Sequence, residues 1–128
     1  MIVGVGVDLV RIDRIGRLLD RYGSRFARKV FTPTEWTESG GRASHLAGRF
    51  AVKEAVLKAL GTGLSGGIAW HDVETLSRES GAPEVRTSGV VRSLLERKGP
   101  VCIWASISHE RENAVAMVIL EGGDRCVS

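Results

Sequence analysis

The chain has 128 residues, of which 43% are hydrophobic and 26% charged, and its formal net charge at pH 7 is +3. This length fits one domain with its own hydrophobic core, and the composition excludes disordered and fibrous classes. The apolar runs Ile2–Val7 and Val115–Leu120 are too short to span a bilayer, and the N-terminus lacks the charged region of a signal peptide. We therefore expect a cytoplasmic protein without a membrane span.

A short apolar stretch with two glycines opens the chain. Ile2–Val7 predicts a buried strand, in which Gly4 and Gly6 allow another backbone or a ligand to approach closely. Asp8 follows directly. A carboxylate at the end of such a strand commonly lies at the edge of a site, so Asp8 is a candidate functional residue.

The other elements are predicted from capping residues, turn residues and apolar periodicity. Thr32-Pro33-Thr34-Glu35 is typical of a helix start, with a Thr cap, Pro at the first position and Glu three residues after the cap. The expected helices are about Val10–Tyr22, a turn at Phe26–Phe31, a short helix after Thr32, Ala43–Leu60 and a helix from Ser88 to about Lys98. The later expected strands lie within Ile68–Ser77, Glu84–Thr87, Val101–Ser108 and Ala114–Leu120, the last two as a hairpin. This order predicts an α+β fold, a small antiparallel sheet packed with one long and several short helices.

The long helix is apolar almost all round between Leu46 and Leu60. Two polar stripes interrupt it, Arg49 with Lys53 and Glu54 with Lys58. On a surface helix, a Glu–Lys pair at i,i+4 is an ordinary contact worth a few tenths of a kcal/mol. Apolar neighbours place the Glu54 stripe against protein or in a cleft instead.

Asp8 and Glu54 together suit a hard divalent cation, because Mg²⁺ takes one or two carboxylates plus waters and substrate phosphates. Lys58 can then meet the phosphate that such a cation holds. His109, which follows Ser106-Ile107-Ser108, can donate to a phosphate or orient a nucleophile, or it can be structural. These residues indicate an enzyme.

A basic stripe is expected along the first helices. Its arginines recur every three or four residues: Arg11, Arg14, Arg17, Arg21, Arg25 and Arg28. Such a stripe suits nucleic acid, an acidic protein or a membrane surface, or it is a solvated helix face. The 5% aromatic content weakens the option of single-stranded nucleic acid. A non-catalytic basic binding module is therefore the alternative to an enzyme, but it has no need for Asp8 and Glu54.

Several motifs occur together in the order and spacing of one family. They are Gly4-Val5-Gly6-Val7-Asp8, Arg14, Phe26-x-x-Lys29-Val30-Phe31-Thr32, Gly48-Arg49-Phe50-Ala51-Val52-Lys53-Glu54-Ala55-Val56-Leu57-Lys58-Ala59, Gly61-Thr62-Gly63 and Ser106-Ile107-Ser108-His109. From Met1 to about Glu121 the chain resembles the holo-acyl-carrier-protein synthases, the small phosphopantetheinyl transferases of bacterial fatty-acid synthesis. The resemblance implies the 4′-phosphopantetheinyl transferase fold in a single domain over residues 1–121. Residues 122–128 lie beyond it, and we expect them to form a disordered tail.

The resemblance also implies a reaction. Phosphopantetheine passes from coenzyme A to a serine of apo acyl carrier protein, and adenosine 3′,5′-bisphosphate is released. Asp8 and Glu54 are implied as the ligands of a Mg²⁺ that bridges to the pyrophosphate. Glu54 would help to deprotonate the serine, directly or through a metal-bound water, and Lys58 would neutralise or protonate the departing phosphate.

The resemblance further implies partners and an assembly. The predicted contacts with coenzyme A come from Arg49, Phe50, Lys58, Gly61, Gly63 and His109. The acidic carrier protein would dock on Arg14 and Arg21, with Arg17 and Arg25. We expect a homotrimer with its sites between subunits, and no nucleic acid or membrane as a partner.

Overall fold

A computed structural model describes residues 1–123 of the chain, and the structural statements that follow concern those residues. The elements in chain order are β1 (Ile2–Arg11), α1 (Ile12–Tyr22), α2 (Ser24–Val30), α3 (Pro33–Ser39), α4 (Ala43–Leu60), the 3₁₀ turn η1 (Trp70–Asp72), β2 (Val73–Ser77), β3 (Pro83–Thr87), α5 (Gly89–Glu96), β4 (Val101–His109) and β5 (Asn113–Gly122). The predicted α+β class is confirmed.

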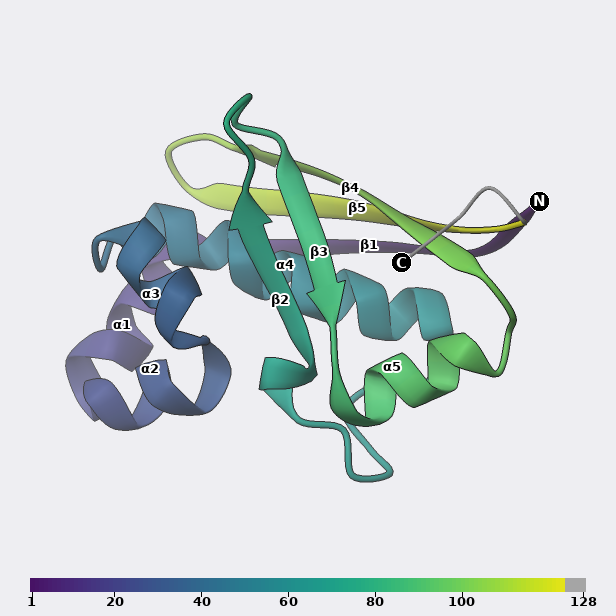
Figure 1. The fold of residues 1–128 in the computed structure, drawn as a ribbon. Helices are drawn as coiled ribbons and strands as arrows, with labels where there is room; N and C mark the ends of the chain where they lie inside the picture. Colours follow the sequence, from purple (N-terminus) through teal and green to yellow (C-terminus); the bar gives the residue numbers. More distant parts are fainter. Residues whose placement is uncertain (124–128) are drawn as a thin grey trace.

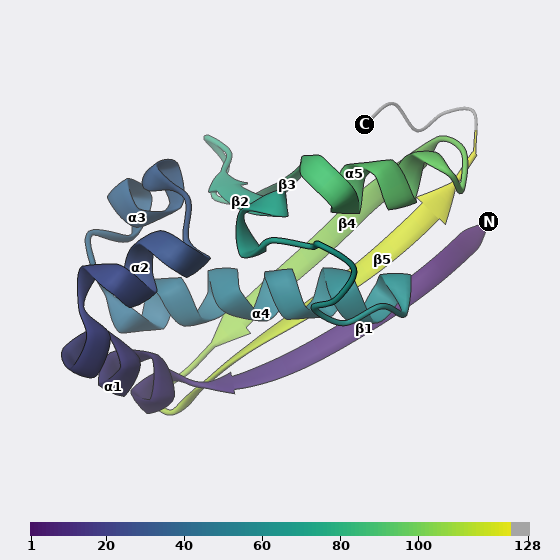
Figure 2. The same cartoon turned by 90° about the horizontal axis from the view of Figure 1, so that it is seen from below.

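The strands form two antiparallel sheets rather than the one sheet expected. A three-stranded sheet has the order β1-β5-β4, and β2 pairs with β3 in a separate ribbon. The predicted hairpin is the β4–β5 pair. In the two views α4 lies across the three-stranded sheet, with the β2–β3 ribbon on its other side and α1, α2 and α3 gathered near its N-terminal end (Figures 1 and 2).

The position of α4 between the two sheets explains its apolar sequence. The helix begins at Ala43 and ends at Leu60 as predicted, and Gly61 closes it in the left-handed conformation with a φ of 78°. Most side chains from Leu46 to Leu57 are buried, because the helix is covered on several faces. Arg49 and Lys53 are among the buried residues, and Glu54 and Lys58 are not.

The first strand is longer than predicted. It continues to Arg11, because its pairing with β5 extends as far as the Arg11–Asn113 pair. Asp8 therefore lies within β1, opposite Ala116, and does not follow the strand as expected. Alternation along the strand turns Asp8 toward α4, on the same face as Gly4 and Gly6.

Of two helix starts that were predicted from capping residues, one is confirmed and the other has a different cap. At α3 the Thr32 side chain accepts from the Glu35 N–H, and the Glu35 side chain accepts from the Thr32 N–H, which confirms the predicted capping box. At α5, Ser88 occupies the cap position, but its side chain makes no cap hydrogen bond. Asp72 of η1 accepts from the Val90 N–H at 3.1 Å instead.

One face of the three-stranded sheet packs on α4, and the other carries large exposed side chains. Those on the outer face include Val5, Val7, Leu9, Trp104 and Met117. None of the helices in residues 1–123 is long and apolar enough to cross a membrane. Of the predicted tail, Gly122 belongs to β5, and residues 124–128 lie outside the described residues.

Candidate active site

The candidate site depends on an unusually close contact between β1 and α4. A Cβ atom added to Gly6 would overlap the carbonyl oxygen of Ala55, and one added to Gly4 would overlap that of Ala59. Only glycine allows the two backbones to approach in this way. The sequence left open whether a backbone or a ligand approaches these glycines, and the structure places the backbone of α4 there.

This contact brings the carboxylate of Asp8 to the ammonium of Lys58. Lys58 Nζ lies 2.9 Å from Asp8 Oδ1 and also donates to the carbonyl oxygen of Val7 at 3.1 Å. The hydrogen bond to Asp8 raises the pKa of Lys58. Residues that are fifty positions apart in the chain are thus joined between β1, an outer strand of the sheet, and α4.

Glu54 lies one turn before Lys58 and completes the cluster. Burial raises the pKa of Glu54, and the negative charge of Asp8 raises it further, whereas Lys58 and Arg14 lower it. All three residues are therefore close enough for their charges to act on Glu54. The site combines two carboxylates with two cations at the junction of β1, α4 and α1.

The donor set of this cluster fits Mg²⁺ better than a metal held by protein alone. Within residues 1–123, no group of three or more His, Cys, Asp or Glu side chains gathers to hold a metal ion. Asp8 and Glu54 supply two carboxylates, and Mg²⁺ commonly takes one or two carboxylates together with waters and substrate phosphates. The residues present therefore suit a cation shared with a phosphorylated substrate.

Arg14 reaches the site from α1 across an aromatic surface. Its guanidinium lies 5.7 Å from the centroid of the Phe50 ring, and Phe50 packs on Trp70 with 5.1 Å between the ring centroids. Phe50 is only 5% exposed and belongs to the core. Its predicted contact with coenzyme A stays a prediction, and in the structure its ring lies beneath the Arg14 guanidinium.

A second polar cluster lines a pocket of about 300 Å³ on another side of α4. Arg49 Nη2 donates to Ser77 Oγ at 2.7 Å, and His45 and His109 line the same pocket. Within residues 1–123, Arg49 Nε and His45 Nδ1 are buried without a hydrogen-bond partner. Burial lowers the pKa of His45, and the charge of Arg49 lowers it further. Such a pocket suits an anion.

The sequence assigned no role to His45, because nothing in its local sequence points to a site.

The two clusters do not meet within one chain. Asp8 lies on β1 and His109 on β4, and β5 separates these two strands. On α4, Glu54 and Arg49 point about 140° apart, since each residue turns the helix by about 100°. The predicted contacts with coenzyme A are therefore divided between two sides of the molecule.

The predicted loop contacts lie beyond the end of α4. Gly61 and Gly63 are exposed and belong to the connection between α4 and η1. Gly61 begins this loop one turn after Lys58, where its N–H donates to the carbonyls of Leu57 and Lys58. The place of the loop next to Lys58 is compatible with the predicted role, which stays a prediction.

The arginine stripe is divided among three elements, because Arg11 ends β1 and the other arginines lie on α1 and α2. Arg14, Arg17 and Arg21 lie on α1, and Arg25 lies on α2, after the chain has turned at Gly23. All four side chains are exposed. Arg17 forms an ion pair with Asp13 at 3.5 Å, and Arg21 lies over the ring of Tyr22. A basic surface is present, but it is not one continuous stripe.

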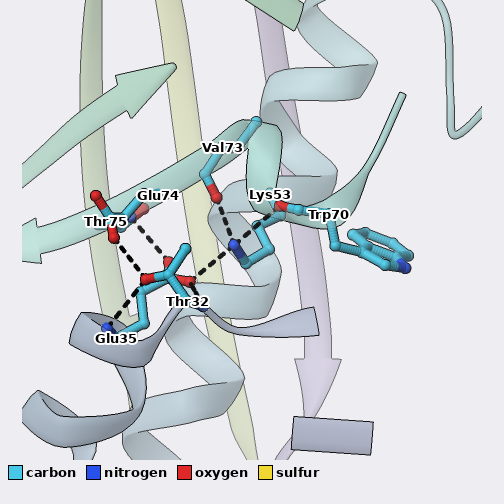
Figure 3. Close-up of polar contacts among 7 residues, drawn as sticks. All are labelled: Thr32, Glu35, Lys53, Trp70, Val73, Glu74 and Thr75. Carbon is cyan, nitrogen blue, oxygen red and sulfur yellow. Dashed lines mark hydrogen bonds and ion pairs between the residues drawn. The ribbon is translucent and has the colours of Figure 1, made fainter. Parts of the chain in front are cut away.

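The largest difference from the sequence analysis concerns Lys53. The helical wheel placed it in a polar stripe with Arg49 and gave it no partner, and the structure buries it in an ion pair with Glu35 of α3 (Figure 3). A signal was present, because a charge on a helix that is apolar almost all round must be buried with a partner. Which residue supplies that partner is a tertiary property.

Comparison with known proteins identifies the family. The family model described as the 4′-phosphopantetheinyl transferase superfamily matches residues 4–118. Holo-[acyl-carrier-protein] synthase of Desulfovibrio desulfuricans is 47% identical over 122 residues, which cover 94% of this chain and 98% of that protein. The enzyme of the same name from Maridesulfovibrio salexigens is 43% identical over 123 residues, covering 94% and 99%.

Solved structures show the same architecture. The crystal structure of holo-[acyl-carrier-protein] synthase from Neisseria meningitidis superposes with a TM-score of 0.86 at 34% identity, covering 95% of this chain and 100% of that chain. The Helicobacter pylori structure, solved in complex with coenzyme A, has a TM-score of 0.83 at 29% identity and covers 91% and 99%.

Proposed function

The chain belongs to the 4′-phosphopantetheinyl transferase superfamily and, within it, to the holo-[acyl-carrier-protein] synthases, and we propose that Asp8, Glu54 and Lys58 form its catalytic centre. The reaction is transfer of phosphopantetheine from coenzyme A to an acyl carrier protein. The observation that carries the assignment of the centre is the 2.9 Å contact between Lys58 Nζ and Asp8 Oδ1, with Glu54 beside it. The Helicobacter pylori relative bound to coenzyme A supports coenzyme A as the donor.

Asp8 and Glu54 would hold Mg²⁺ at this centre. The ion would supply positive charge against the pyrophosphate of coenzyme A, which is what phosphoryl-type transfer requires most. The two carboxylates fit this role in number and type. Lys58 would lie next to the same phosphates and add a second positive charge.

The bond changes follow from this arrangement. The serine hydroxyl oxygen of the carrier attacks the phosphorus that bears pantetheine, and a serine–phosphate bond forms. The bond from that phosphorus to the bridging oxygen breaks, and adenosine 3′,5′-bisphosphate leaves with the electron pair. Glu54 accepts the serine proton, directly or through a water. Lys58 neutralises or protonates the departing phosphate.

The exposed arginines of α1 and α2 would bind the carrier protein. Arg14, Arg17, Arg21 and Arg25 present positive charge on the side of the molecule from which Arg14 reaches Glu54. An acidic carrier would be steered to this surface and brought to the centre with its serine.

A homotrimer with its sites between subunits accounts for two further observations. The anion pocket of Arg49 and His109 lies on the other side of α4 from Asp8 and Glu54, so a second subunit is needed to complete a coenzyme A site. The outer face of the three-stranded sheet carries large apolar side chains, which association of subunits would bury. The cytoplasmic location stays a prediction.

Intact mass measurement tests the proposed function. Apo acyl carrier protein is incubated with the enzyme, coenzyme A and Mg²⁺, and we expect the carrier to gain the mass of one phosphopantetheine. The gain should disappear with EDTA or with a carrier whose acceptor serine is alanine, and adenosine 3′,5′-bisphosphate should appear in equal amount. A carrier of unchanged mass would refute the function and leave a basic binding module as the alternative.

A further inference from the structure

A buried ion pair that the reaction does not use joins four elements of the fold. Lys53 Nζ donates to Glu35 Oε1 at 2.9 Å, to the Trp70 carbonyl oxygen at 3.1 Å and to the Val73 carbonyl oxygen (Figure 3). An ammonium group has three hydrogens, and here each has an acceptor. Lys53 therefore ties α4 to α3, to η1 and to the start of β2.

Both carboxylate oxygens of Glu35 also accept hydrogen bonds from backbone N–H groups. Its Oε1 atom accepts from the Thr32 N–H and its Oε2 atom from the Thr75 N–H, both at 2.9 Å. The Glu35 and Lys53 side chains have no significant exposure. A buried pair in which each group has its hydrogen bonds satisfied has one favourable geometry, so it holds its neighbours in defined positions.

One of those neighbours leads toward the proposed docking surface. The carbonyl of Trp70 accepts from Lys53, and its indole packs on the ring of Phe50. Arg14 of α1 lies over that ring, and its charge acts on Glu54. A continuous path of contacts thus runs from the buried pair through two aromatic rings to an arginine at the candidate site.

The position of η1 depends on Lys53 on the side that faces α4. On its other side, η1 is held by Asp72, whose carboxylate accepts from the N–H groups of Val90 and Val91 at the start of α5. Loss of the Lys53 hydrogen bond would leave η1 attached to α5 but free to shift relative to α4. The Trp70 indole, and with it the surface beneath Arg14, would shift as well.

We propose that Lys53, held by Glu35, is a positioning residue for carrier-protein docking, which it serves by fixing the Trp70–Phe50 surface that supports Arg14. This inference rests on the proposed function, because it assumes that Arg14 binds the carrier. It assigns to Lys53 no contact with either substrate.

A double-mutant cycle tests the path. We compare wild type, Lys53→Met, Arg14→Ala and the double variant at low salt, with rates normalised to the folded fraction measured by circular dichroism. Lys53→Met should raise the KM for the carrier about fivefold, a coupling of the size seen between residues linked through a backbone shift, with little change in kcat. In the Arg14→Ala background, the same change should add almost nothing.

If Lys53 served only the stability of the fold, Lys53→Met would give a different result in this cycle. It would lower the folded fraction, and after normalisation both KM values and kcat would equal those of wild type. Leu95→Ala, a truncation in the core of α5 outside the network, serves as the stability control and should show that behaviour. If Lys53→Met does not fold, Trp70→Leu replaces it in the cycle, because it removes the indole and keeps the ion pair.

The outcomes separate this inference from the proposed function. Additive effects of the two changes, or an unchanged carrier KM in both Lys53→Met and Trp70→Leu, would overturn the path from Lys53 to Arg14 while transfer itself persists. A wild-type enzyme that transfers no phosphopantetheine would overturn both. A raised carrier KM that the Arg14→Ala background abolishes would support the inference.

Discussion

Two lysines on α4 make ion pairs of the same length, and the pairs differ in exposure. Lys53 lies 2.9 Å from Glu35, with the two side chains 1% and 0% exposed. Lys58 also lies 2.9 Å from its partner, Asp8, but these side chains are 54% and 14% exposed. Burial lowers the pKa of Lys53, whereas the hydrogen bond to Asp8 raises the pKa of Lys58.

This difference shows how one helix serves both structure and chemistry. A buried pair loses its hydration and is stable only while all its hydrogen bonds are present, so it holds the fold in one arrangement. An exposed pair exchanges its partners with water and with charged ligands at little cost. Asp8 and Lys58 can therefore release each other for a cation and a phosphate, but Lys53 and Glu35 cannot release each other without disturbing the fold.

The strongest test of the contrast makes the same substitution at both lysines. Lys53→Met should lower the free energy of unfolding by about 3–5 kcal/mol, because it leaves the Glu35 carboxylate buried without its partner. Lys58→Met should leave the midpoint of urea unfolding almost unchanged and should reduce turnover. Equal shifts of the two midpoints would contradict the division of roles.

Removal of Asp8 or Glu54 from the candidate site should reduce turnover and spare stability, the reverse of the effect expected for Lys53→Met. Asp8→Asn and Glu54→Gln should each lower kcat by about 10²–10³-fold, the usual cost of losing a group that stabilises charge in the transition state. Neither variant should unfold at a lower urea concentration than wild type. Full metal-dependent turnover in both would show that neither carboxylate is needed.

A change in the backbone contact should disturb the exposed pair and spare the buried one. Gly6→Ala places a methyl group on the Ala55 carbonyl oxygen and should destabilise the chain by about 1–3 kcal/mol. Because β1 must move, Asp8 should also separate from Lys58, and turnover per folded molecule should fall. Gly16→Ala is the matched control, since its methyl would meet only Ala43 Cβ at 3.9 Å. A Gly6→Ala variant as stable and active as this control would refute the close contact.

The smallest expected effect is on the pH dependence of stability. Burial and Asp8 raise the pKa of Glu54 above its ordinary 4.5, so the folded chain binds this proton more tightly than the unfolded chain does. Without metal, the contribution of Glu54 to stability is therefore present below pH 4.5 and is lost as the pH rises through the raised pKa. Thermal unfolding of wild type and Glu54→Gln should show this slope in wild type alone. Identical slopes would place Glu54 in ordinary solvent.

Local sequence signals predicted most of the architecture. A C-cap glycine located the end of the long helix, and a capping box located the start of α3, because these signals act within a few residues. The end of β1 could not be predicted in the same way, since it depends on pairing with β5, more than a hundred residues later. Asp8 was therefore expected after the strand and lies within it.

The candidate site was predictable in part. Its carboxylates and Lys58 were identified from chemistry and resemblance, and the structure brings Asp8 and Lys58 together. Neither the separation of Arg49 and His109 from them nor the partner of Lys53 could be read from local sequence. Both depend on which side of α4 each sheet covers.

Titration with Mn²⁺, a spectroscopic substitute for Mg²⁺, tests most directly the claim that Asp8 and Glu54 form a cation site. The electron paramagnetic resonance signal of free Mn²⁺ is followed with coenzyme A present and corrected for coenzyme A alone. We predict one bound ion per chain for wild type and none for Asp8→Ala or Glu54→Ala, each with an unchanged circular dichroism spectrum. Equal Mn²⁺ binding by wild type and both variants would contradict the site.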